Sequence, residues 1–475
     1  MANIVTDKNI SNTIAQDINI DNTIVQDTNI ENILSGEKES DDIETLRKQF
    51  ITRGLTGFVN VGNTCYMNSA LQCLMATDIL VTYLRGHGGD HGEYKNDLKD
   101  ALIRLLASEY KKEHEGEDVI VRMKEVKEKF KQTLTYALRN LCVVYWGANC
   151  KIKPKLFKNL LGDMKSTFVG ASQNDSQECL SFILDQIHEE TKTDVVVELK
   201  NIPNGVSDYK EIIDYYAKLS SNKHITDGEK DKIKMELSTL KQDHLKEDAF
   251  LNGITYWQKY LKKNHSVIVD IFTGLYFSQI ICSNCKYHSF NYEPYNLISL
   301  SIPFIQGDLT LEQCFTNNFN VDEDLKDSNQ YNCENCSQKS DAVKNTTLWH
   351  IPHRLVIQFK RFVNAGQMTY KNKKNIKFPF VGLDLKQCTS HYVDGEHMYD
   401  LYGVINHCGD LRCGHYIAYT KNQINGKWYL YDDSNVLHID DDKIEEKING
   451  SEAYVLFYKK RNDALNITTL SDDDF

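Results

Sequence analysis

Proline, glycine and long apolar runs are all scarce in this sequence of 475 residues. It contains only six prolines and 25 glycines, and 41% of its residues are hydrophobic and 26% charged. This composition is close to the globular average and excludes collagen-like, coiled-coil and wholly disordered chains. No stretch approaches the roughly 18 consecutive apolar residues of a membrane span, and the first residues do not resemble a signal peptide. We therefore expect a soluble, unsecreted protein with no membrane partner.

Basic charge is also scarce, and the acidic excess lies mostly at the two ends. Residues 1–50 carry a net charge of −6 and residues 462–475 a net charge of −4, so the total of −12 leaves only −2 for residues 51–461. Proteins that bind nucleic acids usually display a net basic face. We therefore expect no nucleic-acid partner. The length leaves room for about three ordinary domains or one large enzyme core.

The first 50 residues contain three degenerate decamers, which begin at Asp7, Asp17 and Asp27. Their few apolar side chains offer little burial to offset the entropy of ordering the chain, which argues against a β-solenoid. We predict that residues 1–50 are disordered, that residues 51–461 fold, and that residues 462–475 form an acidic tail.

Thirteen cysteines, an odd number, are too few for a disulfide scaffold. A reducing compartment fits better, and there thiols bind metal, perform chemistry or fill the core. We expect an intracellular location, cytoplasmic or nuclear. The abundance of Asn, Ile and Lys is typical of an AT-rich genome, so a protist or a large virus, acting in its host cell, is a candidate source.

The first half of the chain is predicted to be rich in helices. Thr64 is a candidate N-cap for a helix that begins at Cys65, residues 95–146 read as mostly helical, and a third helix begins at Asp175 behind a capping box of Asn174 and Gln177. Residues 194–265 are dominated by charge and read as an insertion, with one helix capped by Thr226-x-x-Glu229.

The second half changes to short β-like runs after Val267. The predicted strands are Leu355–Phe362, Leu401–Ile405, Tyr416–Tyr419, Trp428–Tyr431 and Ala453–Tyr458. Helices followed by strands indicate an α+β enzyme rather than a doubly wound α/β fold.

Cys65 is placed at the first turn of an amphipathic helix. The unpaired N–H groups and the positive end of the helix dipole favour a thiolate over a thiol at that position. A nucleophilic cysteine needs this form near neutral pH. A buried structural cysteine near a helix start is the alternative.

His415 follows Gly414 where a loop enters a predicted strand, and the next strand ends on two acids, Asp432 and Asp433. A carboxylate there can hold the imidazole in the tautomer that accepts a proton from a thiol. A structural histidine and a turn of two aspartates are the alternatives. Together with Cys65 these residues form a candidate catalytic constellation.

The chain resembles the ubiquitin-specific proteases, papain-like cysteine deubiquitinases. The matching segments run from Gly57 to about Tyr458 and include GNTCYMNS around Cys65, QNDSQE around Asp175, LVIQFKRF from Leu355 and GHYIAY from Gly414. The resemblance implies a thumb of helices, an antiparallel palm and zinc-ribbon fingers at about 266–345. It also implies cleavage after the C-terminal Gly-Gly of ubiquitin by a protein that we expect to be a monomer.

The resemblance also assigns roles to individual residues. Cys65 is implied as the nucleophile, His415 as the general base and Asp432 as the orienting acid, with Asp433 as a rival or helper. Asn60 matches the family's oxyanion-hole side chain, where the loss of one donor costs roughly 3–4 kcal/mol. The implied ubiquitin contacts are Asp175, Gln177, Glu178 and Tyr416. Two acids that stabilise a helix N-terminus are the alternative for Asp175 and Glu178.

Two C-x-x-C pairs, Cys282 with Cys285 and Cys333 with Cys336, predict one structural zinc ion per chain. Four thiolates suit a closed tetrahedral site with no open position for chemistry. A redox pair is the alternative for either pair alone. The long gap between the pairs fits fingers whose strands run between two knuckles, where zinc would supply cohesion.

Three alternatives to a ubiquitin hydrolase stay open: a silent ubiquitin-binding scaffold, a zinc-ribbon adaptor and an isopeptidase for a related modifier. The natural conjugate and the preferred chain linkage are not predicted. Cys408 and Cys413 lie on the loop that leads to His415. We hypothesise that they trap an oxidised Cys65 as a reversible disulfide, against the alternative of two ordinary thiols.

Overall fold

The computed structural model describes residues 2–5, 52–85, 129–199, 202–222, 224–365, 368–393, 395–410, 413–448 and 450–461. The acidic tail, residues 6–51 and the first part of the predicted helical stretch 95–146 lie outside the described residues. Within the described residues, no helix has both the length and the apolar character needed to cross a membrane.

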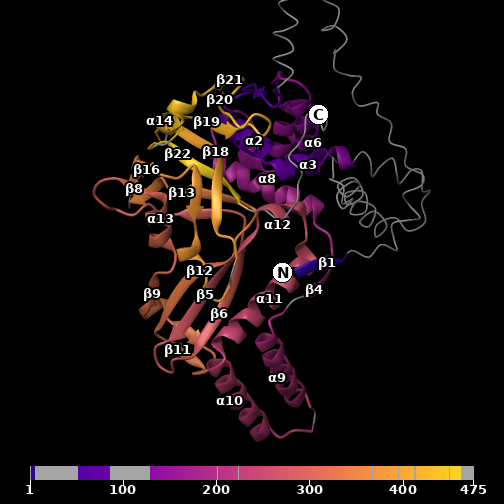
Figure 1. Cartoon of the computed structure of the whole chain (residues 1–475), viewed down its shortest axis with the longest axis vertical. Coiled ribbons are helices and arrows are strands. Elements are labelled where there is room, and N and C mark those ends of the chain that lie inside the picture. The colour runs from indigo at the N-terminus through magenta and orange to yellow at the C-terminus, as the bar shows by residue number, and fades with distance from the viewer. Residues whose placement is uncertain are drawn as a thin grey trace, which may run out of the picture.

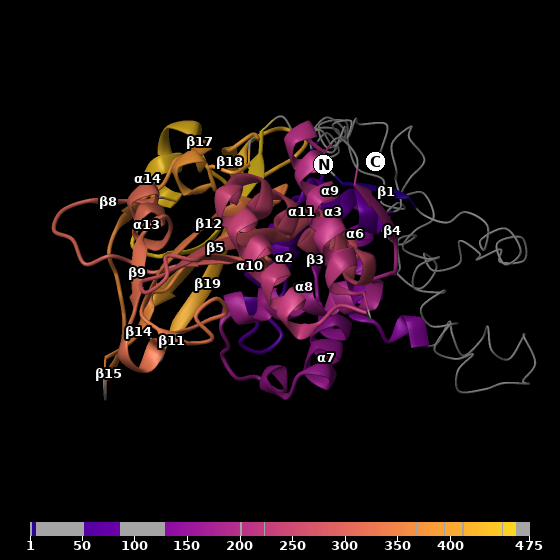
Figure 2. The ribbon, with the colours of Figure 1, turned by 90° about the horizontal axis from the view of Figure 1, so that it is seen from below.

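A lobe of helices, which corresponds to the predicted thumb, lies beside the large sheet (Figures 1 and 2). Its helices are α2 (Cys65–Met75), α3 (Asp78–Arg85), α6 (Leu134–Gly147), α7 (Lys155–Met164), α8 (Ser176–Thr191) and α12 (Val267–Phe272). Two short strands, β2 (Gly57–Phe58) and β3 (Lys151–Ile152), pair in parallel at its edge. Every residue of α2 is buried, because α2 lies between α8 and the large sheet. The helix predicted to begin at Cys65 is confirmed.

The large sheet corresponds to the palm. Its strands, in spatial order, are β21 (Asn435–His438), β20 (Trp428–Asp432), β19 (Gly414–Lys421), β18 (Met398–Gly409), β22 (Ala453–Lys460), β13 (Arg354–Phe359) and β7 (Ile298–Leu300), and β17 (Val381–Asp384) pairs with β18. All neighbours are antiparallel except β13 and β7. All five predicted strands overlap strands of this sheet, so the α+β assignment is confirmed.

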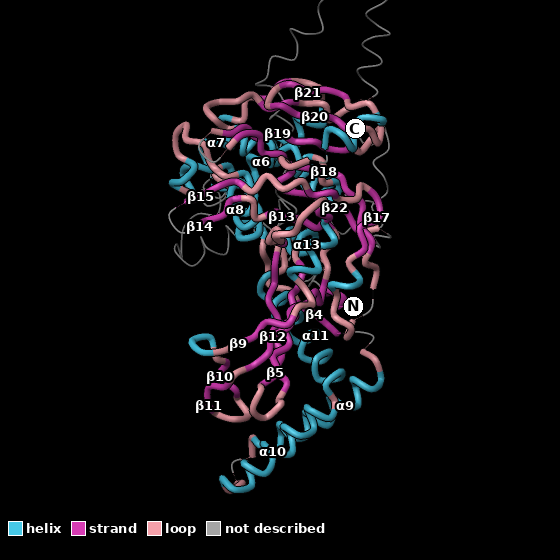
Figure 3. Tube along the Cα trace, turned by 90° about the vertical axis from the view of Figure 1, so that its left-hand side faces the viewer, coloured by secondary structure: helices cyan, strands magenta, loops and turns pink. Residues whose placement is uncertain are grey.

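A second sheet of four strands extends from the palm as the fingers (Figure 3). It consists of β6 (His288–Tyr295), β5 (Gly274–Cys282), β12 (Ala342–His350) and β9 (Asp322–Leu325), and at its tip are β10 (Tyr331–Cys333) and β11 (Gln338–Ser340). The fingers therefore begin at Gly274 rather than near residue 266, because α12 packs against α8 and belongs to the thumb.

Smaller elements complete the palm and its edges. They are β8 (Leu309–Thr310), α13 (Leu311–Asn318), β14 (Phe362–Ala365), β15 (Met368–Lys371), β16 (Ile376–Lys377) and α14 (Ile444–Ile448), with short 3-10 turns at Ser166–Phe168, Asp327–Asn329, Lys386–Cys388 and Asp441–Lys443.

The predicted insertion forms a helical arm. It contains β4 (Val196–Leu199), α9 (Asn204–Ser220), α10 (Asp227–Asp243) and α11 (Leu245–Asn264), and α9 and α10 project from the body as a hairpin (Figure 1). The capping box of Thr226 and Glu229 is present at the start of α10, as predicted. The four residues of β1 (Ala2–Val5) pair with β4 in antiparallel register, and the disorder expected for residues 1–50 stays a prediction.

Candidate active site

The loop before α2 fixes the position of the Cys65 thiol. The Asn60 Oδ1 accepts hydrogen bonds from the backbone N–H groups of Gly62 at 3.1 Å and Thr64 at 3.0 Å. Thr64 is the N-cap residue of α2, but its hydroxyl accepts from the N–H of Val61 and makes no side-chain cap. The predicted helix start and the predicted N-cap residue are therefore both confirmed, although the Thr64 hydroxyl itself does not cap the helix.

The Cys65 side chain is only 4% exposed. Burial raises the pKa of the Cys65 thiol above its ordinary value, and the carboxylate of Asp433 raises it further. The backbone groups of Tyr416 and Tyr66 favour the thiolate but do not outweigh burial. The helix N-terminus was expected to favour the thiolate of Cys65; burial acts in the opposite direction, because desolvation penalises the charged form.

His415 and Asp432 form a pair on adjacent strands. The His415 Nε2 lies 2.7 Å from Asp432 Oδ1, and both side chains are between two-fifths and half exposed. His415 is at the start of β19, opposite Cys408 of β18, and Asp432 is the last residue of β20. In the described part of the chain no hydrogen bond joins His415 to Cys65. The Nε2 contact leaves Nδ1 of the ring as the atom that can accept a proton from a thiol.

Asp433 contacts a different set of groups from Asp432. Its carboxylate accepts hydrogen bonds from the side-chain amides of Asn60 at 3.0 Å and Asn68 at 2.8 Å. Its carbonyl accepts from the backbone N–H of Phe58 at 2.9 Å. Asp433 has a positive φ of 50°, a conformation that non-glycine residues adopt rarely. The turn after β20, which follows Asp432, is therefore hydrogen-bonded both to the loop before α2 and to α2 itself.

The residues expected to contact ubiquitin differ in how far their side chains are already hydrogen-bonded within the protein. Asp175 is the N-cap of α8 and accepts from the N–H groups of Gln177 and Glu178, so the capping box predicted at Asn174 is wrong by one residue. Its second oxygen accepts from the Tyr454 hydroxyl at 2.7 Å. Burial raises the pKa of the Asp175 carboxyl despite these hydrogen bonds. The Gln177 amide donates to the Ser181 hydroxyl, while Glu178 is exposed.

A cavity of about 230 Å³ opens beside the Cys65 thiol. It is lined by Cys65, Tyr66, Gln173, Asn174, Asp175, Phe362, His407, Asp410, Gly414 and Tyr416. Sequence reasoning singled out Cys65, Asp175 and Tyr416 for the site and missed Phe362, His407 and Asp410. The sequence did offer a signal for them: Phe362 ends the segment that begins at Leu355, and His407 and Asp410 lie shortly before Gly414.

The four cysteines of the two C-x-x-C pairs converge at the tip of the fingers. Their sulfur atoms all lie within 4.8 Å of one another, with Cys282 to Cys336 at 3.9 Å and Cys285 to Cys333 at 3.6 Å. Tetrahedral zinc with Zn–S bonds of about 2.3 Å requires sulfurs roughly 3.8 Å apart. The residue after each pair, Lys286 or Ser337, has a positive φ, so both pairs turn in the same way. This donor set fits a structural zinc ion.

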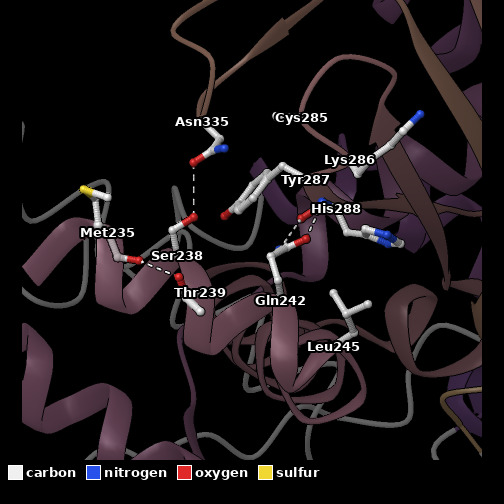
Figure 4. A pocket seen from close by; sticks show the side chains of 10 residues that line it. All are labelled: Met235, Ser238, Thr239, Gln242, Leu245, Cys285, Lys286, Tyr287, His288 and Asn335. Atoms are coloured by element: carbon white, nitrogen blue, oxygen red, sulfur yellow. Dashed lines mark hydrogen bonds between the residues drawn. The ribbon is translucent and has the colours of Figure 1, made fainter.

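A second, larger cavity of about 490 Å³ lies between α10 and this cysteine cluster (Figure 4). The side-chain amide of Gln242 bridges the backbone of His288, accepting from its N–H at 2.8 Å and donating to its carbonyl at 3.4 Å. The Ser238 hydroxyl donates to Asn335, which lies between Cys333 and Cys336 in the sequence. These contacts connect the arm to the fingertip, far from Cys65.

Of the two loop cysteines, Cys413 is exposed, whereas Cys408 does not have the properties of a redox trap. The Cys408 thiol donates to the Glu452 carboxylate at 3.1 Å. Burial, and next the Glu452 carboxylate, raise the pKa of Cys408 to about 12. A thiol that stays protonated reacts slowly in disulfide exchange. The structure therefore argues against the redox hypothesis for this residue.

A buried cysteine at a helix start, next to a strand pair that presents a hydrogen-bonded histidine and aspartate, is the arrangement expected of a papain-like thiol hydrolase. The profile of the family described as ubiquitin carboxyl-terminal hydrolase matches residues 56–458, and the chain belongs to this family. It is therefore a cysteine-type ubiquitin hydrolase.

Individual relatives agree with this membership. A probable ubiquitin carboxyl-terminal hydrolase of Acanthamoeba polyphaga mimivirus is 31% identical over 86% of this chain and 90% of its own length. Human ubiquitin carboxyl-terminal hydrolase 2 is 28% identical over 86% of this chain, which spans 55% of the human protein. A SAGA DUB module containing Ubp8, Sgf11, Sus1 and Sgf73, bound to monoubiquitin, has a similar fold, with a TM-score of 0.55 at 23% identity over 87% of this chain and 70% of that chain.

Proposed function

We propose that the protein is a thiol-dependent deubiquitinase that hydrolyses the bond after the C-terminal glycine of ubiquitin in conjugates or precursors. The observation that carries this proposal is the 2.7 Å pair of His415 and Asp432 on the strands that pack against α2, whose first residue is Cys65. The substrate carbonyl would enter the cavity beside Cys65.

The reaction has two steps. His415 accepts the thiol proton, and the Cys65 sulfur attacks the glycine carbonyl carbon to form a tetrahedral intermediate. The C–N bond then breaks, His415 gives its proton to the leaving amine, and a thioester remains on Cys65. Water, deprotonated by His415, attacks the thioester and releases ubiquitin and the free thiol. Because burial raises the pKa of Cys65, proton transfer to His415 is needed for efficient attack.

Asp432 would hold the His415 ring in the tautomer that accepts a proton, the role of the acid in other triads. Asn60 would donate to the oxyanion of the tetrahedral intermediate. Its amide nitrogen carries two protons, and Asp433 accepts one at 3.0 Å, which leaves the other for the substrate. Asp433 would thus position Asn60 rather than His415.

The acidic residues at the start of α8 support recognition of the arginine-bearing tail of ubiquitin. Glu178 is exposed and is the better placed of the two acids to pair with an arginine. Asp175 lines the cavity, but two backbone N–H groups and the Tyr454 hydroxyl already occupy its carboxylate. Tyr416 and Gln177 would contribute contact area around the tail.

We also propose that Cys282, Cys285, Cys333 and Cys336 hold one structural Zn²⁺. When bound, the ion would crosslink the two halves of the fingertip without taking part in the reaction. We further propose that the enzyme acts as a monomer inside cells, cytoplasmic or nuclear. Mass spectrometry of the purified chain tests the zinc content, and its sedimentation tests whether it is a monomer.

Hydrolysis of a ubiquitin C-terminal fluorophore amide tests the proposed activity. Cys65→Ala should abolish turnover and leave ubiquitin binding almost unchanged, since the thiol supplies chemistry and little contact area. More than a few per cent of residual activity would disprove the role of Cys65. Ubiquitin with a C-terminal electrophile should label Cys65 alone. Parallel probes built on related modifiers distinguish a deubiquitinase from an isopeptidase for another modifier.

A further inference from the structure

His407 is a second histidine at the active site, and the reaction proposed above does not use it. It lies in β18, opposite Tyr416 of β19, and its side chain lines the cavity beside Cys65. The residue is only 5% exposed. Buried histidines without a structural hydrogen bond are costly, so the position of this ring requires an explanation.

The ring is held firmly in place. Its centroid lies 4.6 Å from that of Tyr416 and 5.4 Å from that of Phe362. The backbone N–H of His407 donates to the Glu452 carbonyl at 2.9 Å, and its carbonyl accepts from the buried ammonium of Lys371. Both ends of the residue are thus fixed by the palm.

Gly414 leaves room for this ring because it has no side chain. A Cβ at position 414 would lie 2.0 Å from His407 Nε2 and 2.7 Å from its Cε1, a distance that no real structure tolerates. The glycine before His415 was expected to allow close backbone approach, and the group that approaches is the imidazole of His407. The edge that carries Nε2 therefore lies directly over the backbone of the residue that precedes the proposed general base.

The other ring nitrogen, Nδ1, is enclosed by protein and has no hydrogen-bond partner among the described residues. Nε2 is not enclosed in this way, and it lies beside Gly414, which lines the same cavity, so it is the ring nitrogen that can meet a ligand there. Burial, and next the charge of Lys371, lower the pKa of His407 to about 4, so the imidazole is neutral at physiological pH. A neutral ring suits an uncharged peptide group better than a carboxylate or an ammonium.

We propose that His407 is a substrate-binding residue, which hydrogen-bonds through Nε2 to the backbone of the last residues of ubiquitin as they pass through the cavity to Cys65. This inference rests on the proposed deubiquitinase function and deepens it. It assigns the binding of the uncharged glycine end to His407, whereas the acids at the start of α8 would meet the charged part of the tail.

The test compares two forms of ubiquitin on two variants of the full chain. In a Cys65→Ala background, binding of ubiquitin and of ubiquitin without its last two residues is measured by calorimetry. His407→Phe keeps the ring volume but lacks Nε2, and it should weaken binding of full-length ubiquitin about five- to tenfold, the value of one hydrogen bond. Binding of the truncated form should not change. His407→Gln, which restores a polar group, should recover part of the loss.

Other results would overturn the proposal. An equal loss for both forms of ubiquitin would show that His407 only maintains the fold, and no loss for either form would show that it makes no contact. Thermal unfolding of each variant identifies a folding defect. If His407→Phe has such a defect, the binding data for His407→Gln alone decide whether His407 contacts ubiquitin. Turnover of the fluorophore amide by the unmodified chain tests the deubiquitinase function separately, because the binding comparison does not require hydrolysis.

Discussion

The catalytic body and the fingers with their helical arm are built in different ways. The thumb and palm contain two large buried clusters, and α2, which carries Cys65, is buried along its whole length. Among the described residues, the fingers and arm share a small cluster around Phe277, Tyr292 and Trp349, the arm takes part in two smaller ones, and α10 has no buried residue. The body is therefore stabilised by apolar burial, whereas the tip of the fingers depends on local polar contacts and a cysteine cluster.

The arm shows this difference within a single segment. The α11 backbone approaches the Trp349 indole so closely that a Cβ at Gly253 would lie 2.3 Å from the ring. The Tyr292 hydroxyl donates to the carbonyl of Ala249 in the same helix. The preceding helix, α10, contacts the fingertip through the Gln242 amide and the Ser238 hydroxyl. Apolar packing anchors one end of the arm, and polar contacts attach the other.

The two aspartates provide the sharpest test of the body. Asp432→Asn should lower kcat by about 10⁴, as the loss of the orienting acid does in other triads. Asp433→Asn should lower it by about 10²–10³, because Asn60 loses its anchor and one oxyanion donor is misplaced. Both are measured with the ubiquitin fluorophore amide. The reverse order would make Asp433 the third catalytic member.

Removal of the metal should affect the fingers and arm but not the catalytic body. Chelation, or Cys333→Ser, is expected to raise amide exchange about tenfold or more at the fingertip and in α10, because the hydrogen bonds of Gln242 and Ser238 depend on the two cysteine turns. Exchange in α2 should stay unchanged. Gln242→Ala is the matched control: it should loosen α10 while the zinc content is retained. Equal loosening of α2 would disprove the separation of the two regions.

Each region also contains a histidine that should make it sensitive to acid. Burial lowers the pKa of His350 in the fingers to about 3 and that of His407 in the palm to about 4. Histidines in the unfolded chain have a pKa of about 6.5, so below this pH the unfolded state binds protons that the folded state does not bind. The stability that these residues contribute is complete above pH 6.5 and is lost as the pH falls towards about 4 for His407 and about 3 for His350.

This loss has a slope of at most about 1.4 kcal/mol per pH unit for each histidine. The slope is measured from urea midpoints between pH 7 and 4.5. His350→Gln should flatten it for a fluorescence probe in the fingers, and His407→Gln for a probe in the palm. If either substitution changes both probes equally, the two regions unfold as one unit.

Deletion of residues 1–44 should have the smallest effect. It removes β1 and therefore exposes β4, but neither strand contacts the candidate site. Turnover of the fluorophore amide should stay within about twofold, while exchange at β4 rises. A large fall in turnover would mean that the N-terminal segment takes part in catalysis.

Much of the fold was predictable, in both regions, because its signals are local. The helix at Cys65, the strand after Gly414 and the two cysteine turns each follow from a short pattern of apolar spacing, capping or metal-ligand residues. The resemblance of these segments to the ubiquitin-specific proteases then supplied the expected order of thumb, palm and fingers. Errors at this level were small, such as the N-cap at Asp175 instead of Asn174.

By itself the sequence determined which residues carry chemistry, and only the tertiary structure decided which partner each one has. Adjacent aspartates look alike in sequence, yet Asp432 pairs with His415 while Asp433 pairs with Asn60, 373 positions away. The ring of His407 in the cavity wall and the contact of α10 with the fingertip are equally nonlocal. The physical reason is that a hydrogen bond depends on distances of about 3 Å, which are set by how strands register and helices pack, and no local pattern contains that information.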